Sequence, residues 1–189
     1  LASALKQNEV KVFFICRDHQ GNLCDLIRNH GFDVVVLPAA LKGIQDQDFL
    51  DSSTWLGVPW QEDARHTENA FESLEIKPDL IVVDHYSINH HWESAMRSSA
   101  GRIMAIDDLA DREHDCDLLL DQNLIANMKT RYTGLVAKGC DMLLGPEYSL
   151  LQPIYLELQK GLPARKGSVK RVLVFFGELG EKNLTGLTL

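Results

Sequence analysis

The sequence has few of the features that would commit a protein to nucleic acid or to a membrane. Its 19 Lys and Arg are outnumbered by 27 Asp and Glu, which gives a net charge of -8. Nucleic acids and anionic membranes bind clustered positive charge instead. No apolar run approaches the roughly 20 residues that cross a bilayer, and no charged-then-apolar leader is seen. We therefore expect a soluble, cytoplasmic protein that binds neither nucleic acid nor a membrane.

The sequence also lacks the common signatures of metal, cofactor and nucleophile chemistry. Its four cysteines, at positions 16, 24, 116 and 140, are widely spaced and form no Cys-x-x-Cys pair. This pattern predicts reduced thiols that pack in the core. The histidines show no zinc-site spacing. There is no Gly-x-Gly-x-x-Gly after the first strand, no P-loop and no Gly-x-Ser-x-Gly. We expect no metal and no cofactor.

What the sequence does contain is an alternation of short apolar runs with helical segments. At 45% hydrophobic residues it can bury a real core. Strands that alternate with helices predict βαβ units, and so an α/β fold with a Rossmann-like parallel sheet flanked by helices. The expected strands are residues 11–16, 34–37, 80–83, 102–106, 118–120 and 142–144, and the expected helices are 22–30, 61–74, 89–98 and, interrupted near Pro153, 148–160.

The pattern changes after Pro146, which predicts a division of the chain. Residues 1–147 form the expected Rossmann-like domain, and residues 148–168 a helix and a basic linker containing Gly and Pro. Residues 169–176 read as a new strand, so residues 169–189 are expected to be the truncated start of a second domain. Residues 1–5 resemble the last turns of a helix, which leads us to expect a chain that begins within an element.

The stretch from Pro78 to Tyr86 is the main candidate site. A short β-branched run predicts a strand buried on both faces, followed by Asp84, His85 and Tyr86. Ligands of open α/β sheets bind beyond the carboxyl ends of strands. Because side chains alternate, Asp84 and Tyr86 should share one side and His85 the other. A phenol with a pKa near 10 is a poor base, so Tyr86 is better suited to orienting a polar ligand. The start of an ordinary loop gives the same pattern.

Two further places could contribute to a site. Asp107 and Asp108 follow the next expected strand and could bind a ligand or a metal, or could simply form structural hydrogen bonds. The segment 107–117 has six acidic residues and one arginine, which is typical of a solvated face. Gly177, after the apolar run 172–176, is a candidate for a phosphate-binding turn.

Five segments carry a resemblance to a known family. They are residues 55–59, 83–86, 106–112, 114–123 and 144–151. In this order, and over nearly the whole chain, they resemble the UDP-sugar hydrolases of pseudaminic acid biosynthesis, a bacterial pathway of flagellin glycosylation. The resemblance implies one half of a GT-B-type fold, with a nucleotide sugar between two Rossmann-like domains. It also implies metal-independent, inverting hydrolysis of UDP-2,4-diacetamido-2,4,6-trideoxy-β-L-altrose to UDP and free sugar.

The resemblance assigns roles to individual residues. Tyr86 matches a catalytic-site tyrosine beside the sugar, with Asp84, His85, Asp107 and Asp108 as further substrate-binding candidates. Gly177 and Asn183 match the nucleotide-binding side. The family's general base is a histidine in a Gly-x-Gly-His loop, which has no counterpart in this sequence.

A second departure lies at the nucleotide-binding turn. Glu178 and Gly180 stand where the family usually has a glycine and an aspartate, and a carboxylate there would repel phosphate. We therefore expect a UDP-sugar as the partner of the parent protein but an inactive fragment.

Two alternatives stay open. One is a GT-B glycosyltransferase that transfers the sugar to an acceptor, and the other is a non-catalytic sugar-nucleotide-binding or interaction domain. Residues 169–189 are also expected to mediate self-association, because a truncated domain exposes apolar surface.

Overall fold

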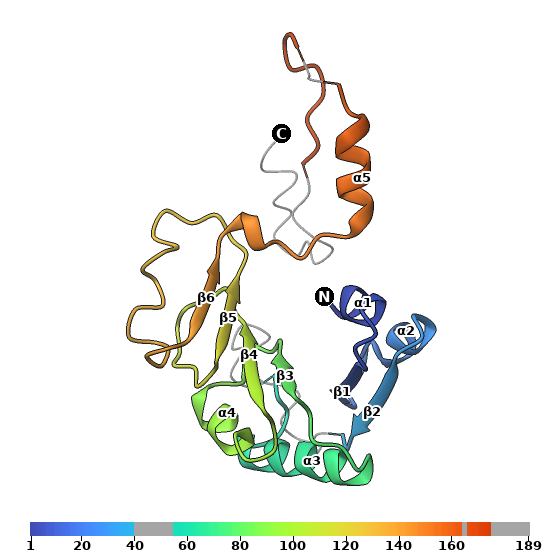
Figure 1. The fold of residues 1–189 in the computed structure, drawn as a ribbon, viewed down its shortest axis with the longest axis vertical. Coiled ribbons are helices and arrows are strands. Elements are labelled where there is room, and N and C mark those ends of the chain that lie inside the picture. Colours follow the sequence, from blue (N-terminus) through green and yellow to red (C-terminus); the bar gives the residue numbers. More distant parts are fainter. Residues whose placement is uncertain (40–54, 164–165, 175–189) are drawn as a thin grey trace. The chain divides into compact units, whose positions relative to one another are not determined.

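The computed structural model describes residues 1–39, 55–163 and 166–174. The chain divides into two compact units, Leu1–Leu150 and Leu151–Leu189. Strands and helices alternate through the first unit (Figure 1). In chain order its elements are α1 (Ala2–Gln7), β1 (Phe13–Arg17), α2 (Cys24–Asn29), β2 (Asp33–Leu37), α3 (Trp60–Ser73), β3 (Leu80–Val83), α4 (His90–Met96), β4 (Arg102–Ile106), β5 (Leu118–Asp121), β6 (Asp141–Leu144) and a 3-10 turn at Pro146–Tyr148.

The strands form two parallel sheets. β1 pairs with β2, and the other four described strands pair in the order β3-β4-β5-β6. The expected α/β, Rossmann-like fold class is confirmed, with the difference that the described strands split between two sheets. Strands β3 (80–83) and β4 (102–106) have the predicted bounds. The bounds of the other strands differ from the predicted ones by one or two residues. The carboxyl ends of β3, β4 and β5 lie along one edge, because their registers place Val83 beside Ala105 and Ile106 beside Leu120.

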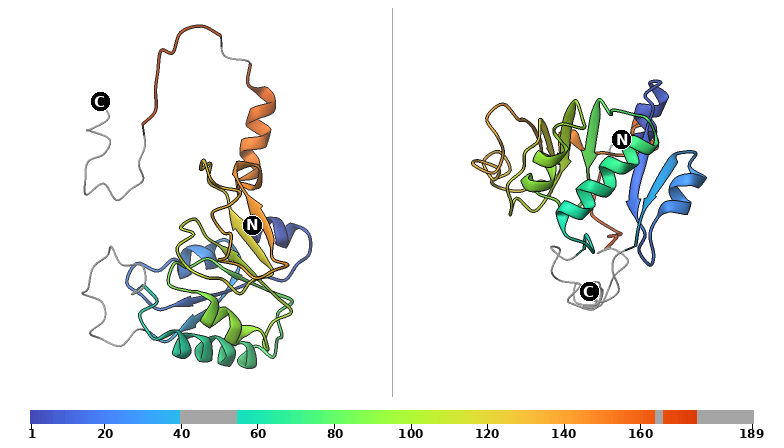
Figure 2. Two further views of the ribbon diagram at one scale, coloured as in Figure 1. Left: turned by 90° about the vertical axis from the view of Figure 1, so that its left-hand side faces the viewer. Right: turned by 90° about the horizontal axis from the view of Figure 1, so that it is seen from below.

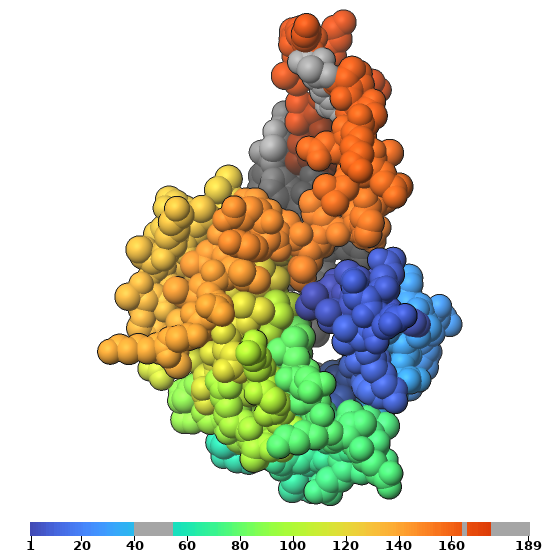
Figure 3. All heavy atoms as spheres, viewed as in Figure 1, coloured from blue at the N-terminus to red at the C-terminus, as the bar shows by residue number. Residues whose placement is uncertain are grey.

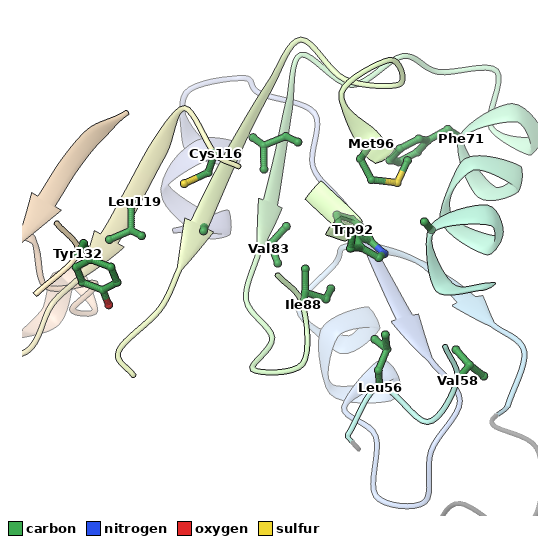
Figure 4. Packing of buried hydrophobic residues seen from close by; sticks show 13 residues of the cluster. Leu56, Val58, Phe71, Val83, Ile88, Trp92, Met96, Cys116, Leu119 and Tyr132 are labelled. Atoms are coloured by element: carbon green, nitrogen blue, oxygen red, sulfur yellow. The ribbon is translucent and has the colours of Figure 1, made fainter. Parts of the chain in front are cut away.

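Helix α3 joins the two sheets. It packs against β2 on one side and α4 on the other (Figure 2). Its inward face contributes Ala64 and Phe71 to a buried cluster that also contains Trp92 and Met96 of α4 (Figure 4). The side chain of Asn89 caps α4 by accepting a hydrogen bond from the backbone N–H of His91 at 3.0 Å. This cap explains why the helix begins one residue later than the predicted start.

The prediction that the strand after Pro78 is covered on both faces is wrong. β3 is an edge strand of the four-stranded sheet, and Leu80 and Val82 are 40% and 36% exposed. Ile81 and Val83 turn to the other face, where they join or pack against the core. Figure 3 shows an opening between the blue segment that holds β1 and the green segment that holds β3. Within the described residues, the face of β3 that carries Leu80 and Val82 is therefore left partly exposed.

The second unit contains α5 (Pro153–Gly161), which begins at the proline that was expected to interrupt a longer helix. Proline suits this first position because its missing N–H would have no helical partner there. Residues 169–174 have no regular secondary structure, so the predicted strand does not form over them, and residues 175–176 lie outside the described part. Within the described ranges, no helix is long and apolar enough to cross a membrane.

Candidate functional site

A small pocket lies where β3, β4 and β5 end. Its volume is about 170 Å³. It is lined by Asp84, Tyr86, Ile106, Asp107, Asp108, Leu120, Gln122, Asn123 and Leu150. The lining residues that follow the strands are polar: Asp84 and Tyr86 after β3, Asp107 and Asp108 after β4, and Gln122 and Asn123 after β5. The structure therefore brings together four of the predicted site residues, Asp84, Tyr86, Asp107 and Asp108, at the edge where open α/β sheets bind ligands.

His85 is placed away from this pocket. Its Nδ1 accepts a hydrogen bond from the backbone N–H of Ser87 at 3.1 Å. Burial lowers the pKa of His85, Asp63 opposes this shift, and the charges of His19, Arg112 and Arg17 add to it. The imidazole is therefore neutral and sits near the carboxyl end of β1. The expected alternation of Asp84 and Tyr86 against His85 is what the structure has.

Tyr86 presents a neutral phenol to the pocket. Burial raises the pKa of Tyr86, and a hydrogen bond to the Asp108 carboxylate raises it further. The ring of Trp55 packs edge-on against it, with centroids 5.6 Å apart. A phenol held in this way can donate to or accept from a polar ligand, but it cannot act as a base near neutral pH.

The pocket is acidic. Burial and the nearby Asp108 charge raise the pKa of Asp84 above its ordinary value. Asp108 Oδ2 accepts from Asn123 Nδ2 at 3.4 Å, whereas Oδ1 is buried and has no hydrogen-bond partner among the described residues. None of the described lining residues is Lys, Arg or His. A ligand that donates hydrogen bonds fits this lining better than an anion.

Asp107 lines the pocket and also contacts residues of the surrounding loops. It is 2% exposed, and its Oδ2 accepts from the Ala110 N–H and the Tyr132 hydroxyl, each at 2.9 Å. Its Oδ1 lies 2.8 Å from Arg112 Nη1. Burial by itself would raise the pKa of Asp107, but Ala110, Arg112 and Tyr132 together lower it. Asp107 is thus an ionised structural carboxylate.

The acidic run 107–117 is only in part the solvated face that its composition indicates, because Asp111 and Glu113 are exposed while the other four carboxylates are buried or half-buried. Asp107 is buried, as described above. Asp115 and Asp117 each form an ion pair with Arg97. The buried Glu93 accepts from the Asp115 backbone N–H at 2.6 Å and lies 2.8 Å from His114 Nδ1. The difference arises because Arg97 follows α4, about twenty positions earlier in the chain, and the local sequence does not indicate this contact.

Two arginines hold the loops that form the pocket. Arg112 donates to the carbonyl oxygen of Ile88 at 2.8 Å, which links the loop after β3 to the loop after β4. Arg131 donates to the carbonyls of Asp108 and Leu109 at 2.9 and 2.8 Å and to Asp121 Oδ2 at 2.9 Å. It thereby links the loop after β4 to the end of β5. The guanidinium groups of both arginines are engaged in these contacts, and neither arginine lines the pocket.

Sequence reasoning missed Gln122, Asn123, Arg131 and Tyr132. The first two follow β5 directly, so the rule that selected Asp84 and Asp107 would have found them. Tyr132 is fully buried, and its hydroxyl reaches Asp107 and Asp121 from a loop. No periodicity marks it.

The two predicted nucleotide-binding residues, Gly177 and Asn183, lie outside the described residues. Across the described ranges, no group of three or more His, Cys, Asp or Glu side chains is arranged to hold a metal ion.

Comparison with known proteins adds two similarities. No protein-family model matches the chain. It is 28% identical over 116 residues to the UDP-2,4-diacetamido-2,4,6-trideoxy-beta-L-altropyranose hydrolase of Campylobacter jejuni, a match that covers 59% of this chain and 42% of that protein. It is also 26% identical over 118 residues to the 4-hydroxy-3-methylbut-2-enyl diphosphate reductase of Synechococcus, covering 58% of this chain and 27% of that protein.

The first similarity agrees with the resemblance carried by the five sequence segments. The chain spans less than half the length of either curated relative. The names of the two relatives describe different reactions, so these similarities alone do not favour one reaction over the other.

Proposed function

We propose that this chain is the sugar-binding part of a nucleotide-sugar hydrolase that cleaves a UDP-linked 2,4-diacetamido-2,4,6-trideoxyhexose to UDP and free sugar. The observation that carries the proposal is the pocket at the ends of β3, β4 and β5, whose described lining is acidic and amide-bearing and has no cation. Sugar hydroxyls and acetamido N–H groups donate hydrogen bonds, and such a lining accepts them. The name of the Campylobacter relative supports the same substrate class.

The roles follow from the contacts. Asp84 and the unpartnered Oδ1 of Asp108 accept from sugar hydroxyl or acetamido N–H groups. The Tyr86 phenol orients the sugar, and Asn123, already within reach of Asp108, offers an amide to an acetamido carbonyl. UDP is bound elsewhere, because its diphosphate would face the carboxylates of Asp84, Asp107 and Asp108 here.

Hydrolysis also needs a base that activates water. The resemblance assigns this role to a histidine in a Gly-x-Gly-His loop, which has no counterpart in this sequence, and none of the described pocket-lining residues is a histidine. The pocket carboxylates Asp84 and Asp108 are assigned to the sugar's donor groups. We therefore infer that the 189-residue chain binds the sugar without turning it over. This also supports a second candidate, a sugar-binding module with no catalytic role.

Saturation-transfer NMR with the free diacetamido sugar and with UDP tests the proposal. The sugar should bind and UDP should not compete with it. Tyr86→Phe should weaken sugar binding about fivefold, since one hydrogen bond contributes about 1 kcal/mol. Asp108→Asn should weaken it at least as much, while Asp33→Asn, at an exposed position on β2, should have no effect. Absence of sugar binding to the wild-type chain would refute the proposal.

Incubation with the intact UDP-sugar separates the candidates. Binding without UDP release is expected of the chain alone. Release of UDP into water would contradict the inferred lack of a base, and transfer of the sugar to an added acceptor would identify a glycosyltransferase.

A further inference from the structure

Two of the four free cysteines lie against each other in the first unit. Cys116 precedes β5 by two residues, and Cys140 comes directly before β6. Their sulfur atoms are 3.7 Å apart. β5 and β6 pair in parallel from Leu118 and Asp141 onward, so the two cysteines stand side by side at the amino ends of neighbouring strands. The sequence separates them by a long loop and gives no sign of this pairing.

The two thiols differ in access and in acidity. Cys116 is 2% exposed and belongs to the buried cluster, whereas Cys140 is half-buried (Figure 4 shows Cys116). The hydrogen-bonding contact with Cys116 lowers the pKa of Cys140, while burial and the charges of Asp141, Asp117 and Glu93 oppose this shift. The same hydrogen bond, together with burial, raises the pKa of Cys116. The pair thus has a half-buried sulfur with a lowered pKa and a second, buried sulfur 3.7 Å from it, which is the arrangement of reactive and resolving cysteines.

We propose that Cys140 and Cys116 are a modification site at which a hydroperoxide forms a reversible disulfide. The Cys140 thiolate attacks one peroxide oxygen, so that an S–O bond forms, the O–O bond breaks and the leaving hydroxide takes up a proton as water. Cys140 is thereby oxidised to a sulfenic acid and the peroxide is reduced. The Cys116 sulfur then attacks the Cys140 sulfur, and the displaced hydroxyl leaves with the Cys116 proton as a second water.

The local backbone permits the closer approach that a bond of about 2.05 Å requires. Cys140 follows Gly139, which has φ 100° and no atom within 4 Å of where a side chain would stand. The Cys140 N–H donates to the Ala137 carbonyl oxygen at 3.2 Å, and the next N–H, that of Asp141, donates to the Asp117 carbonyl oxygen at 2.9 Å, so the freedom lies in the turn before Cys140. Movement can therefore come from the side of Cys140, while Cys116 stays in the core.

The bond would close a loop that supports the pocket. The residues between the two cysteines include Arg131 and Tyr132, whose contacts hold Asp107, Asp108 and Asp121. Cross-linking the ends of this loop restricts it in the unfolded chain. Oxidation should raise the midpoint of thermal unfolding by roughly 5 °C or more.

The other two cysteines provide an internal control. Cys16 and Cys24 are also neighbours, but burial and the adjacent Cys24 raise the pKa of Cys16 to about 11. Cys24 itself is 3% exposed. This pair should stay reduced under conditions that oxidise Cys140.

Peptide mapping by mass spectrometry on the full chain, reduced and then treated with stoichiometric hydrogen peroxide, tests the proposal. The expected result is a linked pair of peptides containing Cys116 and Cys140, a loss of two titratable thiols, and full reversal by dithiothreitol. Cys116→Ser should stop at a sulfenic acid on Cys140 that dimedone traps, and Cys140→Ser should remain unoxidised. Cys24→Ser should behave as wild type.

Wild-type mapping decides the matter even where a serine variant folds poorly. Oxidation of the wild-type chain without the linkage between Cys116 and Cys140 overturns the proposal. So does the recovery of all four thiols after treatment, or a disulfide that includes Cys16 or Cys24 instead.

Discussion

Replacing Arg112 with methionine should destabilise the first unit strongly, because it leaves a buried carboxylate without its cation. The Arg112 side chain is 14% exposed and that of its partner Asp107 is 0% exposed. Removing one partner of such a pair costs about 3 to 5 kcal/mol. Asp107 would keep its hydrogen bonds from Ala110 and Tyr132 at 2.9 Å, which favours the lower end of the range. We expect a loss of about 3 kcal/mol in the free energy of unfolding at pH 7.

The loss should depend on pH in a predictable direction. The pKa of Asp107 is lowered in the folded protein, so its ionised form stabilises the fold above the unfolded pKa of about 3.9 and this contribution disappears as the pH falls below it. Without Arg112 the folded pKa of Asp107 rises. Protonation then relieves the unpaired charge, and the difference between variant and wild type should shrink between about pH 5 and pH 3.

Urea unfolding followed by tryptophan fluorescence, to which the buried Trp92 contributes, measures this difference. Arg28→Met is the matched control, because Arg28 pairs with Asp25 at 3.0 Å on the surface, with 47% and 93% of the two side chains exposed. Such a pair contributes at most about 1 kcal/mol. Asp107→Asn added to Arg112→Met should recover part of the loss, since both charges are then gone. An Arg112→Met loss no greater than that of the control would refute the reasoning.

Three further changes have expected outcomes. Tyr132→Phe removes the hydroxyl that serves Asp107 and Asp121 and should cost about 1 to 3 kcal/mol in urea unfolding, with the same loss at pH 6 and pH 9 because the raised pKa of Tyr132 keeps it protonated in that range. Leu119→Ala, at a fully buried position, should cost about 3 kcal/mol, whereas Leu124→Ala, at a position 79% exposed, should stay within about 0.5 kcal/mol; equal losses would contradict the placement of the core. Asp84→Asn should leave stability at pH 7 unchanged or slightly higher, because a carboxylate with a raised folded pKa disfavours the fold when ionised; a clear loss at pH 7 and not at pH 3 would reverse this sign.

The position of the candidate pocket could be predicted from sequence because strand ends are marked locally. A β-branched run followed by polar residues identifies β3 and its exit, and period-two alternation places Asp84 and Tyr86 together with His85 opposed. The same rule applied to β5 would have added Gln122 and Asn123. These features depend only on neighbours within a few positions.

The environment of those residues could not be predicted, because it depends on distant parts of the chain. The exposure of Leu80 and Val82 reflects which distant elements pack over that face of β3, and no property of the run itself specifies that. The acidic run looked solvated because Arg97 lies about twenty positions earlier, on another element. The contact between Cys116 and Cys140 follows from the register of β5 and β6, which the sequence leaves open.

The arginine contacts have a consequence for how this pocket could change during evolution or in the laboratory. Besides their ion pairs with Asp107 and Asp121, Arg112 and Arg131 hold the loops through main-chain carbonyl oxygens, those of Ile88, Asp108 and Leu109. Every residue type has such an oxygen, so the loops keep their course whichever side chains they carry. Libraries that randomise positions 84, 86, 108 and 122 while leaving both arginines in place should therefore yield many folded members, and the specificity of the pocket can be varied independently of the frame that carries it.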